Sequence, residues 1–195
     1  GMGRCTALML AAAGANLVVS DVNAETAEAT AREAIEKYGV KAVATKCNVT
    51  VKSEVDAMVE LSVKTLGRID ILNHVAGVFG AVDFMKSTEA DYDKQMDINA
   101  KGTYFVDQAV LRIMIPNRAG KIVNMCSQAG KYGFHTNVAY TASKFAVAGM
   151  TQSIAQYAAP YNINVNCVCP GVVRTNIWER ALDDIRRQGG DAEAY

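Results

Sequence analysis

The sequence has 195 residues, of which 50% are hydrophobic and 21% are charged, which is typical of one soluble globular domain with a sizeable core. The 20 basic residues balance the 20 acidic ones, so electrostatics give no reason to expect nucleic acid or a membrane surface as a partner. The most apolar stretches, residues 5–15 and 163–173, are too short or too interrupted to span a bilayer. We therefore expect a cytoplasmic protein without a nucleic-acid or membrane partner.

The expected elements alternate between helix and strand along the whole chain. In chain order they are helix 3–13, strand 15–21, helix 24–38, strand 41–49, helix 53–66, strand 69–75, helix 89–115, strand 121–126, helix 137–159, strand 163–169 and helix 174–187. Glycine or proline follows most of the helices, as expected of helix ends. The strands are nearly continuous in apolar residues, which is typical of a parallel sheet that is buried on both faces. The predicted fold class is α/β, a doubly wound (Rossmann-like) parallel sheet in three α/β/α layers.

Both ends of the sequence depart from this plan. A doubly wound sheet normally opens with a strand that leads into a glycine-rich turn, whereas this sequence opens on Gly1-Met2-Gly3, already inside such a turn. The far end stops at Tyr195 without another strand. We therefore interpret residues 1–195 as a single domain that lacks its first strand and its C-terminal strand.

The five cysteines form no CxxC motif and no paired framework: Cys5, Cys47, Cys126, Cys167 and Cys169. Cys167 and Cys169 are two residues apart on a predicted strand, so they should point to the same face. Two thiols without histidine neighbours make a poor metal site. We expect all five to be small, mostly buried side chains in a reducing cytosol, with no metal or redox role.

Tyr140 and Lys144 form a YxxxK pair, whose spacing places both side chains on one helix face. A free tyrosine has a pKa of roughly 10 and exchanges protons poorly at neutral pH. A neighbouring ammonium favours the phenolate and lowers that pKa, which makes tyrosine a usable acid or base. Taken alone, the same spacing also arises by chance on amphipathic helices.

Three further polar residues each allow two interpretations. Ser127 follows strand 121–126, where its hydroxyl could bind a substrate oxygen or cap a helix. Asn99 lies within the long helix 89–115, either as a tolerated defect or as an anchor for backbone and water. Asp21 closes strand 15–21, where it could accept hydrogen bonds from a dinucleotide ribose and repel a 2′-phosphate, or cap the next helix.

Together these positions resemble the short-chain dehydrogenase/reductase family in its single-domain form, over essentially all 195 residues. Gly1-Met2-Gly3 is similar to the end of the family's glycine-rich turn, Asn48-Val49 to its adenine-contacting Asp-Val pair, and His74-Val75-Ala76-Gly77 to its NNAG motif. The catalytic set of the family is matched by Asn99, Ser127, Tyr140 and Lys144. The segment 170–175 (PGVVRT) matches the family's PGxVxT segment, which holds the nicotinamide carboxamide.

The resemblance implies hydride transfer between a nicotinamide and an alcohol or carbonyl carbon. Tyr140 would carry the proton, Lys144 would lower its pKa and bind the nicotinamide ribose, Ser127 would orient the substrate oxygen, and Asn99 would hold a relay water. The implied cofactor-binding residues are Gly1, Met2, Gly3, Asp21, Asn48, Val49, Val75, Ala76, Gly77, Tyr140, Lys144, Pro170, Gly171, Val173 and Thr175. The implied substrate-binding residues are Ser127, Gln128, Tyr140 and Trp178; no metal is implied. Asp21 favours NAD over NADP.

Two motifs differ from the family pattern. His74 and Val75 replace both asparagines of NNAG, so that only backbone contacts to the cofactor remain at Val75, and we interpret His74 as a structural hydrogen-bonding residue. Asn48 replaces the usual aspartate, although its amide oxygen can still accept a hydrogen bond from the adenine amine.

The substrate and the oligomer follow from the resemblance alone. Gln128 and Trp178 are similar to the pattern of NAD-linked polyol, acetoin and diacetyl reductases. The alternatives are an NADP-dependent 3-oxoacyl reductase, a sugar-nucleotide epimerase or dehydratase, and a non-catalytic nucleotide-binding or oligomerisation fragment. The family also implies a homodimer or homotetramer that is built on the two long helices, 89–115 and 137–159.

Overall fold

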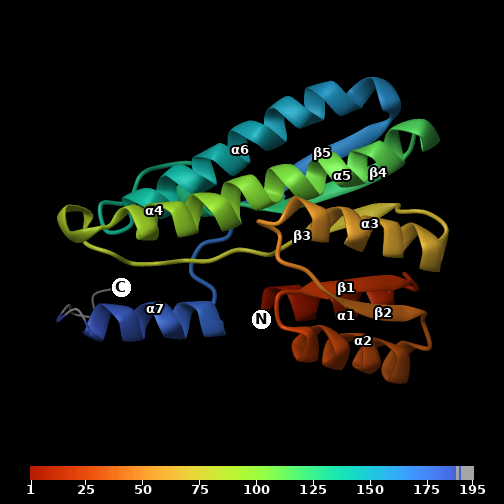
Figure 1. The fold of residues 1–195 in the computed structure, drawn as a ribbon, viewed down its shortest axis with the longest axis horizontal. Helices are drawn as coiled ribbons and strands as arrows, with labels where there is room; N and C mark the ends of the chain where they lie inside the picture. Colours follow the sequence, from red (N-terminus) through yellow and green to blue (C-terminus); the bar gives the residue numbers. More distant parts are fainter. Residues whose placement is uncertain (188, 190–195) are drawn as a thin grey trace.

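The computed structural model describes residues 1–187 and 189, and its fold is shown in Figure 1. Every helix and strand predicted from the sequence is present, with bounds that differ by a few residues. The main elements are α1 (Met2–Ala12), β1 (Leu17–Asp21), α2 (Ala24–Tyr38), β2 (Ala42–Lys46), α3 (Lys52–Leu66), β3 (Ile71–His74), α4 (Glu89–Gln95), α5 (Gly102–Asn117), β4 (Gly120–Met125), α6 (Val138–Ala158), β5 (Ile163–Val168) and α7 (Asn176–Arg187). Four short helical turns join them: η1 (Phe84–Lys86), η2 (Met96–Lys101), η3 (Gln128–Gly130) and η4 (Ala159–Tyr161).

The described strands are all parallel, and they form two hydrogen-bonded groups, β1–β2 and β3–β4–β5. Helices α3, α4, α5 and α6 lie on one side of the strands and α1 and α2 on the other, while α7 lies off to one end (Figure 1). The predicted three-layer α/β/α arrangement is therefore confirmed. Within the described part of the chain no strand joins β1 to β3, as expected of a doubly wound sheet without its central strand.

Apolar side chains form two main clusters beside these strands. The larger one is centred on Met114, Ile122 and Ile163, between β4, β5 and the helices α3, α5 and α6. The smaller one joins α1 and α2 to β1. Burial on both faces was wrongly predicted for β5, because its residues alternate between buried and exposed from Ile163 to Asn166. Helix α6 covers one face of β5, and the alternate residues on the other face, Asn164 and Asn166, are exposed.

The helix predicted over residues 89–115 is interrupted by a turn of π-helix, η2, and it extends through Pro116 to Asn117. Pro116 stands in the last turn of α5, and the backbone turns left-handed two residues later, with Arg118 at φ 50°. Asn99, one of the predicted site residues, lies in this π-helical turn. None of the described helices is both long enough and apolar enough to cross a bilayer.

Candidate active site at the carboxyl ends of the strands

A cavity of about 280 Å³ opens beyond the carboxyl ends of β3, β4 and β5. Parallel α/β sheets bind their ligands at this edge, because the loops that leave adjacent strands meet there. The predicted residues that line the cavity are Met2, Val75, Gly77, Ser127, Gln128, Tyr140, Lys144, Pro170, Gly171, Val173, Thr175 and Trp178. Gly1, Gly3, Asp21, Asn48, Val49, Ala76 and Asn99 do not line it.

Tyr140 and Ser127 meet in this cavity although they belong to different elements. Ser127 follows β4 and begins η3, where its Oγ accepts a hydrogen bond from the Ala129 amide at 3.1 Å. Tyr140 lies in the first turn of α6. Burial raises the pKa of Tyr140, and a hydrogen bond with Ser127 partly offsets that effect. The phenol is therefore held neutral at physiological pH, beside a hydroxyl that can share its proton.

Lys144 lies one helical turn after Tyr140, and its side chain is 4% exposed. Its ammonium donates a hydrogen bond to the Met125 carbonyl at 2.8 Å and lies 5.7 Å from the centroid of the Tyr140 ring. Burial lowers the pKa of Lys144 to about 8, because a charged amine is poorly solvated inside a protein.

The expected lowering of the tyrosine pKa by Lys144 is not seen in this arrangement. The causes that act on the Tyr140 pKa are burial, Ser127 and Cys126, and burial is the largest. The physical reason is geometric: the ammonium is directed at the Met125 carbonyl, so its effect on the phenol is smaller than the cost of burying a phenolate.

Asn99 occupies the π-helical turn η2 and joins three parts of the site. Its Oδ1 accepts a hydrogen bond from the Val78 amide at 2.8 Å, and its Nδ2 donates to the Val78 carbonyl at 2.9 Å and to Ser143 Oγ at 3.0 Å. The side chain is therefore fully used in fixing the loop after β3 against α6. The expected relay water would therefore have to bind the backbone carbonyl of Asn99. That carbonyl also accepts a hydrogen bond from the Thr103 hydroxyl at 2.6 Å.

The glycine of the altered NNAG motif shows how closely the loop after β3 approaches the catalytic candidates. A Cβ atom at Gly77 would lie 3.0 Å from Asn99 Oδ1 and 3.6 Å from Lys144 Nζ. Gly3, in the first turn of α1, faces Val75, and a Cβ there would make an ordinary contact with that side chain at 3.9 Å. The absence of a side chain at Gly77 therefore lets the loop after β3 lie close to Asn99 and Lys144.

The residues expected to bind the adenosine part lie apart from the cavity. Asp21 is exposed at the end of β1, and its Oδ1 accepts a hydrogen bond from the Asn23 amide at 2.9 Å. The cap of α2 is Asn23, so the alternative interpretation of Asp21 as that cap was wrong. The Oδ1 atom of Asn48 already accepts hydrogen bonds from the amide and the hydroxyl of Thr50, and Val49 packs against the larger core cluster.

His74 is buried at the end of β3, while Ala76 in the following loop is exposed. Burial is the main cause that lowers the pKa of His74 to about 4, and the nearby Lys144 charge lowers it further. The imidazole is therefore neutral at physiological pH. Its Nε2 has no hydrogen-bond partner among the described residues, so the expected structural hydrogen bond is not made by this nitrogen.

The substrate side of the cavity is more aromatic than the sequence suggested. Phe79 packs edge-on against Tyr140, with ring centroids 4.8 Å apart, and lies 6.2 Å from the ring of Trp178. The Oε1 atom of Gln128 accepts a hydrogen bond from the Tyr132 hydroxyl at 3.1 Å. Sequence reasoning missed Phe79, although its place just after the NNAG-like motif was a usable signal.

Comparisons with known proteins identify dehydrogenases and reductases that are similar to this chain. The model of a family described as short chain dehydrogenase matches residues 1–186. A sorbitol dehydrogenase from Cereibacter sphaeroides is 39% identical over 92% of this chain and 69% of its own length. A diacetyl reductase from Staphylococcus epidermidis is 35% identical over 100% of this chain and 78% of its own length. A 3-oxoacyl-[acyl-carrier-protein] reductase from Aquifex aeolicus is 34% identical over 96% of this chain and 76% of its own length.

Two solved structures represent both nicotinamide cofactors. An NAD⁺-bound xylitol dehydrogenase superposes with a TM-score of 0.89 at 33% identity, over 98% of this chain and 76% of that chain. An actinorhodin polyketide ketoreductase with NADPH superposes with a TM-score of 0.88 at 30% identity, over 96% of this chain and 71% of that chain. The likeness therefore reaches alcohol dehydrogenases and ketoreductases alike.

Proposed function

Because the chain belongs to the short-chain dehydrogenase/reductase family, we propose that it interconverts a small ketone and the corresponding secondary alcohol, diol or polyol, with NAD(H) as its cofactor. The observation that carries this proposal is the meeting of Tyr140, Ser127 and Lys144 around one cavity at the carboxyl ends of the strands. A bound nicotinamide supplies or accepts the hydride.

The roles of the side chains follow from their protonation states. Tyr140 is a neutral phenol, so it can donate its proton to a carbonyl oxygen during reduction. Ser127 lies beside the phenol and can bind the same substrate oxygen, which stabilises the negative charge that develops on it. Lys144 contributes a positive charge near the phenolate that reduction leaves behind. Because burial raises the Tyr140 pKa, the phenol keeps its proton at neutral pH, which favours reduction of the carbonyl. The rate of alcohol oxidation, which needs the phenolate, should increase as the pH rises.

Asp21 supports the choice of NAD(H). It ends β1 with an exposed carboxylate, and its Oδ1 alone is engaged, by the Asn23 amide. A carboxylate at this position accepts hydrogen bonds from ribose hydroxyls and repels a 2′-phosphate. We expect the ratio of kcat/KM for NADH over NADPH to fall at least tenfold in Asp21→Ser. Equal use of the two cofactors by the unaltered chain would contradict this part of the proposal.

The test of the reaction follows NADH absorbance at 340 nm with a panel of diacetyl, acetoin, keto sugars and polyols. Tyr140→Phe should lower turnover by at least 10²-fold while NADH binding, measured by fluorescence, is retained. The matched control is Tyr38→Phe, which alters an exposed tyrosine on α2 and should leave turnover unchanged. Unchanged turnover in Tyr140→Phe would refute the mechanism, and NADH binding without turnover on any substrate would support the non-catalytic alternative.

A second candidate is an NADPH-dependent 3-oxoacyl reductase, because an enzyme of that name is also similar to this chain. The two candidates differ in the substrate that the cavity must admit. A panel of acetoacetyl thioesters with NADPH decides between them, since a higher kcat/KM there than with diacetyl and NADH would favour the second. A sugar-nucleotide epimerase would instead convert its substrate without net NADH formation.

We also propose that the chain forms a homodimer or homotetramer. Exposed aromatic side chains lie on the two long helices, Tyr104 on α5 and Phe145 and Tyr157 on α6. Light scattering after size exclusion should give a mass two or four times that of the chain, and a mass matching one chain would contradict this expectation.

A further inference from the structure

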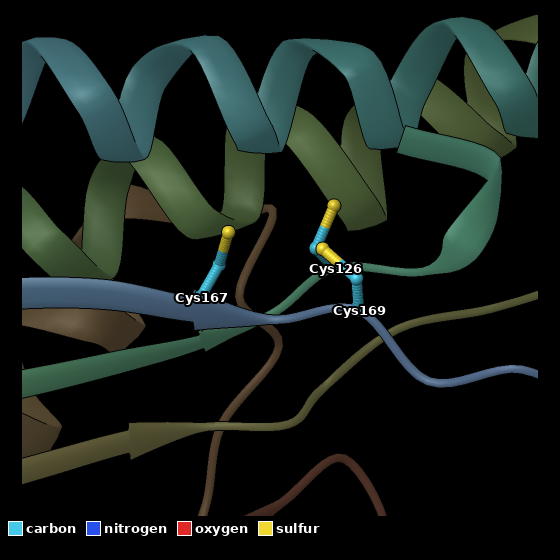
Figure 2. Close-up of side chains that lie close together, drawn as sticks. All are labelled: Cys126, Cys167 and Cys169. Carbon is cyan, nitrogen blue, oxygen red and sulfur yellow. The ribbon is translucent and has the colours of Figure 1, made fainter. Parts of the chain in front are cut away.

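Three thiols converge beside the candidate active site: those of Cys126, Cys167 and Cys169 (Figure 2). Cys126 directly follows β4, Cys167 lies in β5, and Cys169 directly follows β5. The parallel register sets the Cys126 amide against β5, where it donates a hydrogen bond to the Val168 carbonyl at 2.9 Å. The sequence placed two thiols on one face of β5, and the pairing of β4 with β5 adds the third.

The sulfur positions suit a single metal ion. The three Sγ atoms lie within 4.8 Å of one another. For a metal–sulfur bond of about 2.3 Å, three sulfurs in a plane around one ion are about 4.0 Å apart. No pair of sulfurs is therefore more than about 1 Å farther apart than such an ion requires.

The donor set selects the kind of ion. Within the described chain, no histidine or carboxylate joins the three sulfurs. Structural zinc sites use four protein ligands, which this cluster does not provide. Three soft sulfur donors at a largely buried position, where Cys126 is 3% exposed, match a soft ion that prefers few ligands, and thiolates select Cu⁺ among such ions.

One positively charged side chain lies beside the cluster. The Lys144 ammonium is close enough for its charge to interact with Cys126. That positive charge partly offsets the negative charge that the sulfurs acquire as ligands.

We propose that Cys126, Cys167 and Cys169 form a three-sulfur binding site for Cu⁺. On binding, the three S–H protons pass to solvent and three Cu–S bonds form. Copper remains in the +1 state and no electron is transferred, so no oxidant or reductant is needed. Affinity rises with pH because protons are released.

The copper site would act on the neighbouring active site through Cys126. In the metal-free chain its Sγ donates a hydrogen bond to the Lys144 carbonyl at 3.3 Å, and Ser127 is the next residue. A deprotonated, metal-bound sulfur cannot make that bond, so the turn of α6 that carries Lys144 loses a contact. We therefore expect copper to lower enzymatic turnover, and this expectation rests on the proposed function. The binding of copper itself does not depend on the proposed function.

The experiment measures copper without reference to activity. The reduced chain is titrated anaerobically with Cu⁺ in competition with bathocuproine disulfonate, which reports free Cu⁺ by its colour. We expect one Cu⁺ per chain in the unaltered protein and at least tenfold weaker retention in Cys167→Ala/Cys169→Ala. Matched controls are Cys5→Ala and Cys47→Ala, which alter an exposed and a buried cysteine outside the cluster and should retain copper normally.

A second measurement does not depend on a variant. X-ray absorption at the copper edge of the unaltered chain should show three sulfur neighbours at one distance. The inference is overturned if the unaltered chain retains no copper against the competitor, or if X-ray absorption shows fewer than three sulfurs around the ion. It is also overturned if the double variant retains as much copper as the unaltered chain. Circular dichroism checks that the double variant is folded.

Discussion

Replacing Asp107 by asparagine should stabilise the protein at alkaline pH, although Asp107 is fully buried in α5. Its Oδ2 accepts a hydrogen bond from Asn124 Nδ2 at 2.7 Å. Asp107 Oδ1 and Asn124 Oδ1 are both buried without a partner among the described residues, so an ionised carboxylate there would lack full hydrogen bonding. Burial raises the pKa of Asp107 to about 7, against the opposing effect of the Asn124 hydrogen bond.

The pH dependence follows from this raised pKa. The protonated carboxyl is favoured in the folded state, so its contribution to stability is fully present below the unfolded pKa of 3.8 and is lost as the pH rises through about 7. At about 1.4 kcal/mol for each pH unit, the interval from 3.8 to about 7 sets an upper limit of about 4 kcal/mol. The Asp107→Asn side chain would carry an amide that donates to Asn124 Oδ1 without ionising, so we expect a gain between about 1 and 4 kcal/mol at pH 8.

Urea unfolding at pH 5 and at pH 8 measures this prediction directly. Asp107→Asn should flatten the fall in the free energy of unfolding between these pH values, and it should raise that free energy at pH 8. The matched control is Asp93→Asn, which neutralises an exposed carboxylate on α4 and should leave the difference between the two pH values unchanged. Equal or lower stability of Asp107→Asn at pH 8 would refute the reasoning.

Three other outcomes are expected. Reductase turnover should fall as the pH rises through about 8, where Lys144 loses its charge; a flat profile from pH 6 to 10 in stopped-flow measurements would argue against this role. Gly130→Ala should lower the free energy of unfolding by about 1–3 kcal/mol, because the new Cβ would meet Cys126 Sγ and lie 2.8 Å from the Lys144 carbonyl. The control Gly133→Ala adds a Cβ that points into open space. Equal denaturation midpoints for the two variants would count against the close packing at Gly130. Thr88→Ala should cost about 1 kcal/mol without changing kcat, because the Thr88 side chain caps α4, and an unchanged melting temperature would show that the cap contributes little.

Much of the fold could be predicted from the sequence because its signals are local. Hydrophobic periodicity and glycine stops placed α2 over residues 24–38, and the structure has the same bounds. The helix stop at Gly67 is likewise set by one residue, which adopts a left-handed φ of 81°. Such features depend on the nearest residues along the chain, so they need no knowledge of the tertiary structure.

The features that the sequence did not reveal depend on contacts between distant segments. The π-helical turn at Asn99 is stabilised by hydrogen bonds to Val78, which lies 21 residues earlier. Burial of Tyr140 depends on several loops, so the direction of its pKa change could not be taken from the YxxxK spacing. The third sulfur of the cysteine cluster became visible only through the register of β4 against β5.

The π-helical turn η2 also has a consequence for engineering. A π-turn arises where one extra residue is accommodated in a helix, and it is usually less favourable than a regular α-helical turn. Deleting one residue between Met96 and Lys101 should therefore restore a continuous helix from α4 to α5. Because the Asn99 side chain makes hydrogen bonds to Val78 and Ser143, we expect such a deletion to exchange helix regularity for a loosened loop after β3.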